Sequence, residues 1–172
     1  MNEVIKAIKE RRSIRSFKSE QITDEQLNAI LEAGSYAASG MGEQRSMMVA
    51  VQNSEIIAEM SKANAEVMGA DIDPFYGAPT VVVVFADSEA ATPVEDGSLV
   101  IGNLMLAAYS EGVDSCWVHR AKEVFETEMG QKLKKEWGVP DSYAGIGNCI
   151  LGYREEELPA PPDRKEGRII NA

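Results

Sequence analysis

Apolar positions in this chain recur with helical spacing in some stretches and form short continuous runs in others. Helical spacing near the start predicts a short amphipathic helix that ends at about Arg11 or Arg12, with an apolar face of Val4, Ile5, Ala7 and Ile8. A second helix is predicted after Thr23, which can form a capping box with Gln26, and its buried face carries Leu27, Ile30 and Leu31.

The middle of the chain alternates predicted strands with predicted helices. Strands are expected at 47–51, 80–85, 114–118 and 143–152, and the run TVVVVF is typical of a strand buried on both faces. Helices are expected at 55–68, from 93 to about 110, and along a stretch where apolar residues recur at every fourth position: Phe125, Met129, Leu133 and Trp137.

The helix expected at 93–110 has a complete start signal and an unusual surface. Thr92, Pro93 and Glu95 predict an N-cap, a proline in the first turn and a capping glutamate. The helix is apolar on nearly all sides, so we expect it to be buried inside the domain or against a partner subunit.

No internal repeat and no break in composition divides the chain, so residues 1–172 are expected to form one domain. Its last part, 153–172, is expected to be an extended C-terminal arm because 155–163 is acidic and rich in proline. The arm carries a basic group, Arg164, Lys165 and Arg168.

Composition narrows the possible partners. The net charge of -11 and pI near 4.6 argue against nucleic acid or an anionic membrane, because both need a broad basic surface. Without a signal, transit or long apolar segment, we expect a cytoplasmic protein. Cys116 and Cys149 are then expected to be buried reduced thiols rather than a disulfide, and one histidine without clustered cysteines predicts no metal site.

The segment RRSIRSF at 11–17 is the clearest candidate for chemistry. In an extended conformation, Arg11, Ser13 and Arg15 share one face, which presents two guanidinium groups and a hydroxyl to a small anion such as phosphate. The alternative is that these arginines only complement the end of the first helix.

Catalytic side-chain motifs are missing from the sequence: it has no GxSxG, HExxH, P-loop or GxGxxG after a strand. His119, the only histidine, is more often structural than catalytic in such a position. Two basic clusters without a side-chain catalyst are consistent with chemistry carried by a bound cofactor that has a phosphate.

Several segments in order resemble the FMN-dependent nitroreductase family: RRSIRSF, SGMGEQ, GAPTVVVV, GNLMLAA, GVDSCWVHRAKEVF, and ILGY before a proline arm that ends in RK. The resemblance implies an α+β fold with a central mixed β-sheet flanked by helices, and an intertwined homodimer with FMN at the subunit interface. It also implies NADH or NADPH as electron donor.

The resemblance further implies roles for individual residues. Phosphate and ribityl contacts fall on Arg11, Arg12, Ser13, Arg164 and Lys165, and Arg15 would approach the N1 and O2 edge of the flavin. Val118, His119 and Arg120 would offer main-chain N–H groups to flavin N5 and O4. The loop of the other subunit would cover the flavin with Ser39, Gly40, Met41, Gly42 and Gln44.

The chain differs from the family pattern in two respects, the residues of the loop at 42–46 and the length of the segment 68–79, and we expect the flavin contacts of the loop to change. Relatives commonly carry asparagine at the position of Gly42, and a proline and an aromatic residue where this chain has Arg45 and Ser46. The segment 68–79 is shorter than in many members. Nitroaromatics, quinones and free flavins all remain possible electron acceptors. Two other functions are alternatives to an FMN-dependent oxidoreductase: a flavin-binding storage or sensing protein, and an anion-binding domain without flavin.

Overall fold

The computed structural model describes residues 2–171 and confirms the α+β class. Its sheet has the strand order β1-β2-β4-β3 and consists of β1 (Ser46–Val51), β2 (Thr80–Asp87), β4 (Tyr143–Gly152) and β3 (Asp114–Val118). The α-helices are α1 (Glu3–Glu10), α2 (Asp24–Ser35), α3 (Ser54–Met68), α4 (Pro93–Ser110), α5 (Ala121–Glu126) and α6 (Glu128–Glu136).

The sheet differs from the mixed sheet that we expected. All three strand pairs are antiparallel, and parallel pairing within residues 2–171 is limited to an isolated bridge between Ser13 and Ser115. A continuous apolar strand is common in parallel sheets, but it also arises when helices cover both faces of an antiparallel sheet. The second situation holds here.

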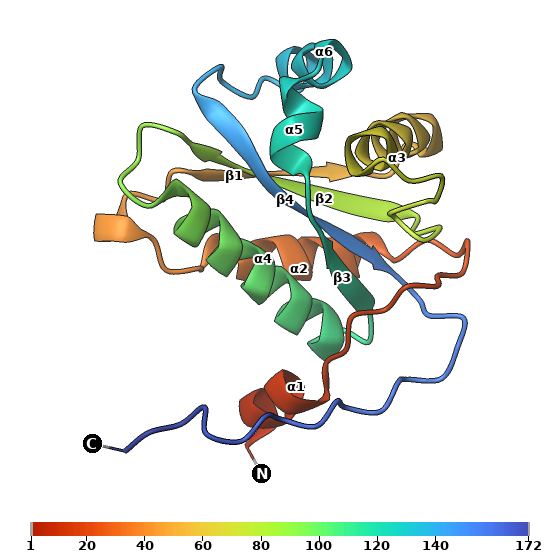
Figure 1. The fold of residues 1–172 in the computed structure, drawn as a ribbon, viewed down its shortest axis with the longest axis vertical. Helices are drawn as coiled ribbons and strands as arrows, with labels where there is room; N and C mark the ends of the chain where they lie inside the picture. The colour runs from red at the N-terminus through yellow and green to blue at the C-terminus, as the bar shows by residue number, and fades with distance from the viewer. Residues whose placement is uncertain (1, 172) are drawn as a thin grey trace.

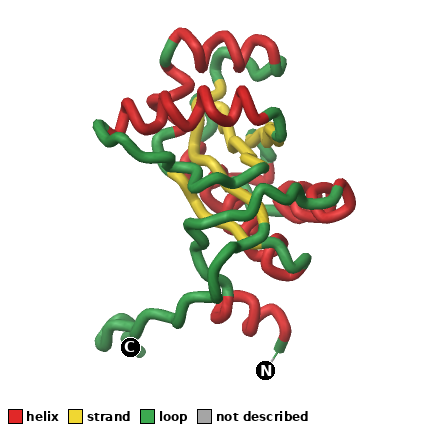
Figure 2. The backbone as a smooth tube through the Cα atoms, turned by 90° about the vertical axis from the view of Figure 1, so that its right-hand side faces the viewer, coloured by secondary structure: helices red, strands yellow, loops and turns green. Residues whose placement is uncertain are grey.

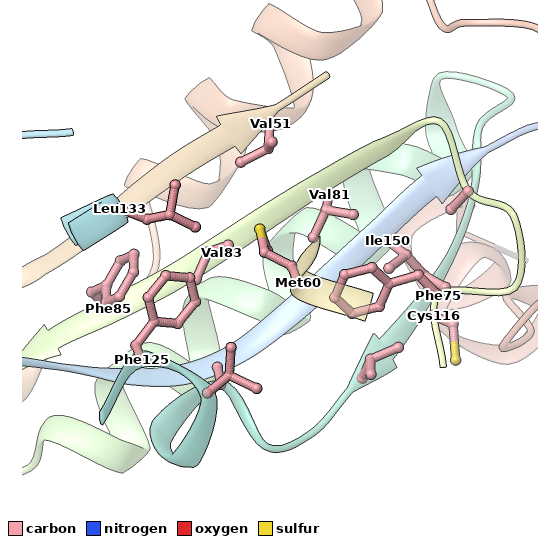
Figure 3. Packing of buried hydrophobic residues seen from close by; sticks show 14 of the residues in the cluster. Val51, Met60, Phe75, Val81, Val83, Phe85, Cys116, Phe125, Leu133 and Ile150 are labelled. Carbon is pink, nitrogen blue, oxygen red and sulfur yellow. The ribbon is translucent and has the colours of Figure 1, made fainter. Parts of the chain in front are cut away.

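Helices cover both faces of the sheet, and β2 shows the consequence most clearly (Figure 1). Val81, Val83 and Phe85 contribute to the core shared with α3, α5 and α6, where Phe85 meets Phe125 edge to face at 4.8 Å (Figure 3). The alternate residues Val82 and Val84 contribute to the core shared with α2 and α4. Every residue of β2 is therefore buried, as the run TVVVVF predicted.

Two helix starts show how far capping signals carry. The capping box of Thr23 and Gln26 is present at the start of α2. The one expected from Thr92 and Glu95 is wrong, because Thr92 makes no side-chain cap bond and its hydroxyl instead donates to Asp96 Oδ1 at 3.0 Å. Asp96 is almost fully buried, so it competes effectively for that hydroxyl.

The single helix expected along 125–137 is in fact two helices. Thr127 ends α5 and caps α6 by accepting from Gly130 N–H through its hydroxyl. Every fourth apolar residue still faces the core, because Phe125 and Leu133 are buried on both sides of the break.

The two ends of the chain leave the body of the protein in different directions (Figure 2). The helix α1 projects from one end, and the residues after Glu155 form an exposed arm in which no hydrogen bond or ion pair is found as far as residue 171. Over residues 2–171, none of the helices has the length and apolar character needed to cross a membrane.

Candidate functional site

The segment 11–17 runs in extended conformation along the edge strand β3. Ile14 N–H donates to Ser115 O at 3.1 Å, and Phe17 forms an isolated antiparallel bridge with Arg154. Ile14 and Phe17 are each only 5% exposed, so their burial in the core anchors the segment. The polar residues between and beside them are left to face outward or along the sheet edge.

Groups of this segment influence the thiol of Cys116 on β3. Burial raises the pKa of that thiol, while the Arg15 charge, the Ser13 hydroxyl and the Arg11 charge each act in the opposite direction. Ser13 forms a bridge with Ser115, next to this thiol on β3, and Arg15 lines a cavity together with Cys116. The net result is a neutral thiol beneath a basic surface.

Arg11 has a guanidinium nitrogen, Nη1, that is buried without a hydrogen-bond partner in residues 2–171. Neither Arg11 nor Arg15 takes part in an ion pair in that part of the chain. An unpaired buried donor is costly, by about 1–3 kcal/mol or more for a charged group. An anion bound here would remove that cost.

Arg12 differs from its neighbours in one of its nitrogens, although its Nε is, like Arg11 Nη1, buried without a hydrogen-bond partner in residues 2–171. Its Nη1 donates to Lys9 O and to Arg11 O, both at 2.8 Å, so the guanidinium caps the C-terminal end of α1. The helix-end interpretation of the arginine cluster therefore applies to Arg12. It does not account for Arg11 and Arg15.

Two cavities meet at Arg15. One, of about 230 Å³, lies between Ser13, Arg15 and the start of the arm at Arg154 and Glu156. The other, of about 210 Å³, is lined by Arg15 with Met68, Ile72, Pro74, Tyr76 and the run Cys116, Trp117, Val118, His119 and Arg120. The fold thus brings two of the sequence-predicted groups, the arginine segment and the turn at 118–120, to one place.

Two buried asparagines behind this turn were not identified from the sequence. Asn64 of α3 and Asn148 of β4 both donate to main-chain carbonyls of the turn. The available signal was an amide in the otherwise apolar run around Asn148, and Asn64 had none, because the stretch around it also contains polar and charged residues.

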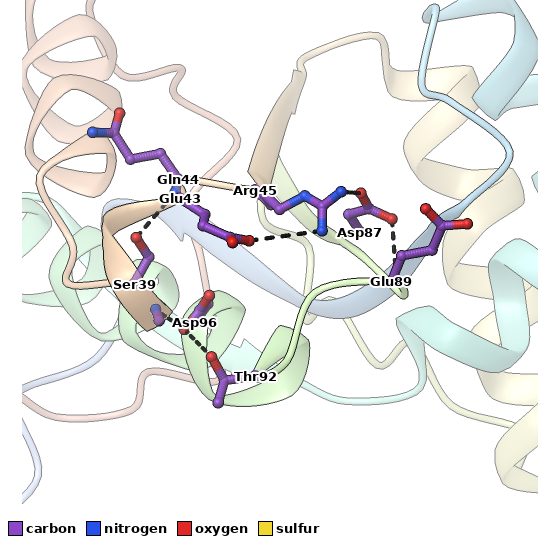
Figure 4. Close-up of polar contacts among 9 residues, drawn as sticks. Ser39, Glu43, Gln44, Arg45, Asp87, Glu89, Thr92 and Asp96 are labelled. Atoms are coloured by element: carbon purple, nitrogen blue, oxygen red, sulfur yellow. Dashed lines mark hydrogen bonds and ion pairs between the residues drawn. The ribbon is translucent and has the colours of Figure 1, made fainter.

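The loop with Ser39, Gly40, Met41, Gly42 and Gln44 lies on the opposite side of the protomer from residues 11–17 (Figure 1). Asp96 of α4 fixes the loop by accepting from Gly40 N–H at 2.9 Å, and the Ser39 hydroxyl accepts from Gln44 N–H at 3.0 Å (Figure 4). Met41 is 93% exposed. Within one protomer, the loop therefore does not meet the arginine segment.

Arg45, one of the three loop positions that depart from the family pattern, has a structural contact. Its guanidinium lies 3.0 Å from the nearly buried carboxylate of Asp87 at the end of β2, and 3.7 Å from Glu43 (Figure 4). Arg45 is therefore engaged in holding the loop to the sheet.

Arg164, Lys165 and Arg168 lie on the exposed arm. Only the start of the arm touches the site, where Glu155 N–H donates to Ser16 O and the Ser16 hydroxyl donates to Glu155 Oε2. A single protomer thus brings together Arg11, Ser13, Arg15, Val118, His119 and Arg120. It leaves the basic group of the arm and the loop at 39–44 elsewhere.

Known proteins with similar sequence and structure agree closely with one another. The sequence pattern described as the Nitroreductase family matches residues 8–74 and 70–153. A protein of Archaeoglobus fulgidus that carries the names NADH dehydrogenase and NAD(P)H nitroreductase is 31% identical over 163 residues, which cover 91% of this chain and 88% of the relative.

Two solved structures with at least 30% identity are similar over the whole of this chain. A nitroreductase with bound FMN from Bacteroides fragilis is 32% identical, with a TM-score of 0.91 over 100% of both chains. A nitroreductase with bound FMN from Desulfitobacterium hafniense is 30% identical, with a TM-score of 0.89 over 100% of this chain and 99% of that one.

Proposed function

Since this chain belongs to the nitroreductase family, we propose that it is an FMN-dependent oxidoreductase that takes its electrons from NAD(P)H. The FMN-bound relatives and the NAD(P)H nitroreductase name of the archaeal relative support the cofactor and the donor. When bound, FMN supplies hydride acceptance and electron transfer, so the side chains need only bind, orient and tune it.

The observation that carries this proposal is the unpaired Arg11 guanidinium beside Ser13 and Arg15. A phosphate offers several acceptor oxygens, so it fits two guanidinium groups and a hydroxyl on one face. We assign Arg11 and Ser13 to the FMN phosphate and ribityl chain, with Arg12 contributing mainly as the cap of α1.

Arg15 has a separate role in the proposal. It lies between the cavity near the phosphate residues and the cavity beside 118–120, where a flavin ring would extend. A positive charge at the N1 and O2 edge stabilises negative charge on that edge, which raises the reduction potential. The N–H groups of Val118, His119 and Arg120 then serve the N5 and O4 edge.

We further propose that the working unit is a homodimer whose two sites lie at the interface. In the described residues, large apolar side chains remain exposed on α1, on α4 and on the arm: Val4, Ile5, Ile8, Val94, Leu99, Ile169 and Ile170. On α4, Leu99, Gly102 and Leu106 share one face, and a Cβ at Gly102 would meet nothing within 4 Å, which leaves room for another helix.

The dimer would also complete the site. The loop with Ser39, Gly40, Met41, Gly42 and Gln44 would reach the flavin of the partner, and the arm would carry Arg164 and Lys165 to a phosphate. Both groups lie away from the arginine segment of their own protomer, so they need a second chain to act there.

We propose nitroaromatic compounds, quinones or similar compounds as acceptors, with donor and acceptor using the same face of the site in turn. The cavity beside Arg15 is lined by Tyr76 and His119, residues with flat rings that suit a planar substrate. This sequential use of one face predicts ping-pong kinetics.

The test is an absorption spectrum of the purified protein before and after anaerobic addition of NADH and of NADPH. The proposal predicts a yellow protein that is bleached by at least one of the two. Yellow protein that neither nucleotide bleaches would favour a flavin storage or sensing role, and colourless protein that takes up no FMN at micromolar concentration would refute both.

A double substitution tests the assignment of the phosphate contacts. The double variant Arg11→Ala, Ser13→Ala should bind FMN about 100-fold more weakly, because the two substitutions remove one charge-assisted and one neutral hydrogen bond. Lys132→Ala, which removes an exposed charge on α6, is the matched control and should leave FMN binding unchanged. Equal FMN occupancy in the double variant and the control would contradict the assignment.

A further inference from the structure

Asn64 and Asn148 lie directly behind the turn at 118–120, and both are at most 1% exposed. The side-chain amide of Asn64 donates to His119 O at 2.8 Å, and that of Asn148 donates to Val118 O at 3.2 Å and to His119 O at 3.5 Å. Two residues from different elements, α3 and β4, thus hold the same pair of main-chain carbonyls.

These bonds determine where the neighbouring N–H groups point. In a trans peptide, the carbonyl of one residue and the N–H of the next point in opposite directions. No cis peptide is present in residues 2–171. Because the carbonyls of Val118 and His119 point toward the asparagines, the N–H groups of His119 and Arg120 point away from them, toward the side of the turn that lines the cavity with Arg15.

Arg120 adds a second reason to regard Asn64 as more than a packing residue. Its φ of 72° is left-handed, a conformation that costs a residue other than glycine about 1–2 kcal/mol. Asn64 Oδ1 accepts from Arg120 Nε at 2.9 Å. Asn64 therefore binds the two adjacent residues with the two ends of one amide, and this stabilises the unfavourable backbone conformation between them.

Asn148 has an energetic cost that packing does not explain. Its Oδ1 is buried without a partner in the described chain, a situation that costs about 1–3 kcal/mol. An apolar side chain in this part of β4 would avoid that cost. The bonds that the amide makes to the turn are what the asparagine provides in return.

We propose that Asn64, supported by Asn148, is a positioning residue that directs the main-chain N–H groups of His119 and Arg120 at the bound flavin. This inference rests on the proposed function, because it needs FMN in the cavity beside Arg15. Neither asparagine touches the cofactor, and neither lines that cavity.

Three variants test the inference. Asn64→Ala removes both bonds, and Asn64→Asp keeps the acceptor for Arg120 Nε but removes the donor to His119 O. Asn28→Asp makes the same chemical change at an exposed position of α2 and is the matched control. FMN affinity is measured by quenching of flavin fluorescence, and the amide of Arg120 is followed in ¹H–¹⁵N spectra of the full-length protein with and without FMN.

Wild type and control should bind FMN equally and show a shift of the Arg120 amide signal on binding. Both Asn64 variants should bind FMN about tenfold more weakly and lose that shift, because the loss of one well-aligned hydrogen bond corresponds to about this factor. If Asn64→Ala does not fold, Asn64→Asp removes only the bond to His119 O and Arg120→Gln removes only the bond from Arg120 Nε, so the two bonds are tested one at a time.

The outcomes separate the two levels of the proposal. Wild type that binds no FMN overturns the proposed function and this inference together. Asn64 variants that bind FMN as tightly as wild type, with the same Arg120 shift, overturn the positioning role alone. Weaker binding with an unchanged Arg120 shift also overturns it, because the asparagine would then act only through stability.

Discussion

Gly40 offers a quantitative test of how the loop at 39–44 is held. A Cβ at this position would overlap the hydroxyl of Thr92, and that hydroxyl donates to Asp96 Oδ1 at 3.0 Å. Thr92 is β-branched and has few rotamers, so Gly40→Ala should displace the hydroxyl and break this bond. A hydrogen bond to a charged group contributes about 1.5–3 kcal/mol.

The net effect is smaller, because alanine restricts the unfolded chain. Gly40 is not among the positive-φ glycines, so the substitution recovers about 0.4–1 kcal/mol from unfolded-state entropy. We therefore expect Gly40→Ala to lower the free energy of unfolding by about 1–2 kcal/mol. In a Thr92→Ala background, where nothing obstructs the methyl group, the same change should be neutral or stabilising.

Gly42→Ala is the matched control in the same loop. Its φ of 70° is left-handed and its Cβ would meet nothing within 4 Å, so it should cost about 1 kcal/mol in both backgrounds. The free energy of unfolding of all these variants is measured by urea denaturation at the same protein concentration and the same FMN concentration. Both concentrations are held constant because FMN binding and subunit association also change the apparent stability. An equal cost of Gly40→Ala with and without Thr92 would refute the reasoning.

Three further predictions address the interface, the flavin and the thiols. Leu99→Glu should convert the dimer to monomers in sedimentation velocity, since it places a charge on a half-exposed apolar position of α4, and a persistent dimer would remove this face from the interface. Arg15→Gln should lower the reduction potential of bound FMN and Arg15→Lys should lower it less, whereas equal potentials in all three proteins would contradict the assigned role. Burial raises the pKa of both Cys116 and Cys149 in the folded protein, so the unfolded chain loses its thiol protons first, and the free energy of unfolding should fall as pH rises above about 8.5. Urea denaturation at pH values from about 7 to about 10 gives the free energy of unfolding as a function of pH, and its decrease with pH should be less steep in the Cys116→Ser variant. An unchanged slope would exclude this thiol as a cause.

Local signals predicted most of the elements correctly. The strands at 114–118 and 143–152 have the predicted bounds, and the capping box at Thr23 is present, because each depends on neighbouring residues alone. The failures arose where a distant group competed. The Thr92 hydroxyl donates to Asp96 instead of capping α4. The Thr127 hydroxyl accepts from Gly130 N–H and so caps a new helix, α6, at a point that the apolar periodicity did not reveal.

The candidate site shows the same division. The arginine segment could be found from its spacing, but the sequence did not show that Arg12 Nη1 caps α1 while Arg11 Nη1 is buried without a partner in the described residues. Asn64 and Asn148 could not be assigned, because the role of a buried amide depends on the main-chain carbonyl to which it donates, and that carbonyl is 29–55 positions away along the chain.

The sequence by itself determined most of the elements, the residue types of an anion site and a resemblance specific enough to suggest FMN. Periodicity, caps and short motifs act over one or two turns, so they can be read without a fold. The tertiary structure decided the antiparallel pairing, the position of the arginine segment beside β3 and the direction of the N–H groups at 119 and 120. Those features depend on contacts between residues far apart in the chain, which only the folded protein brings together.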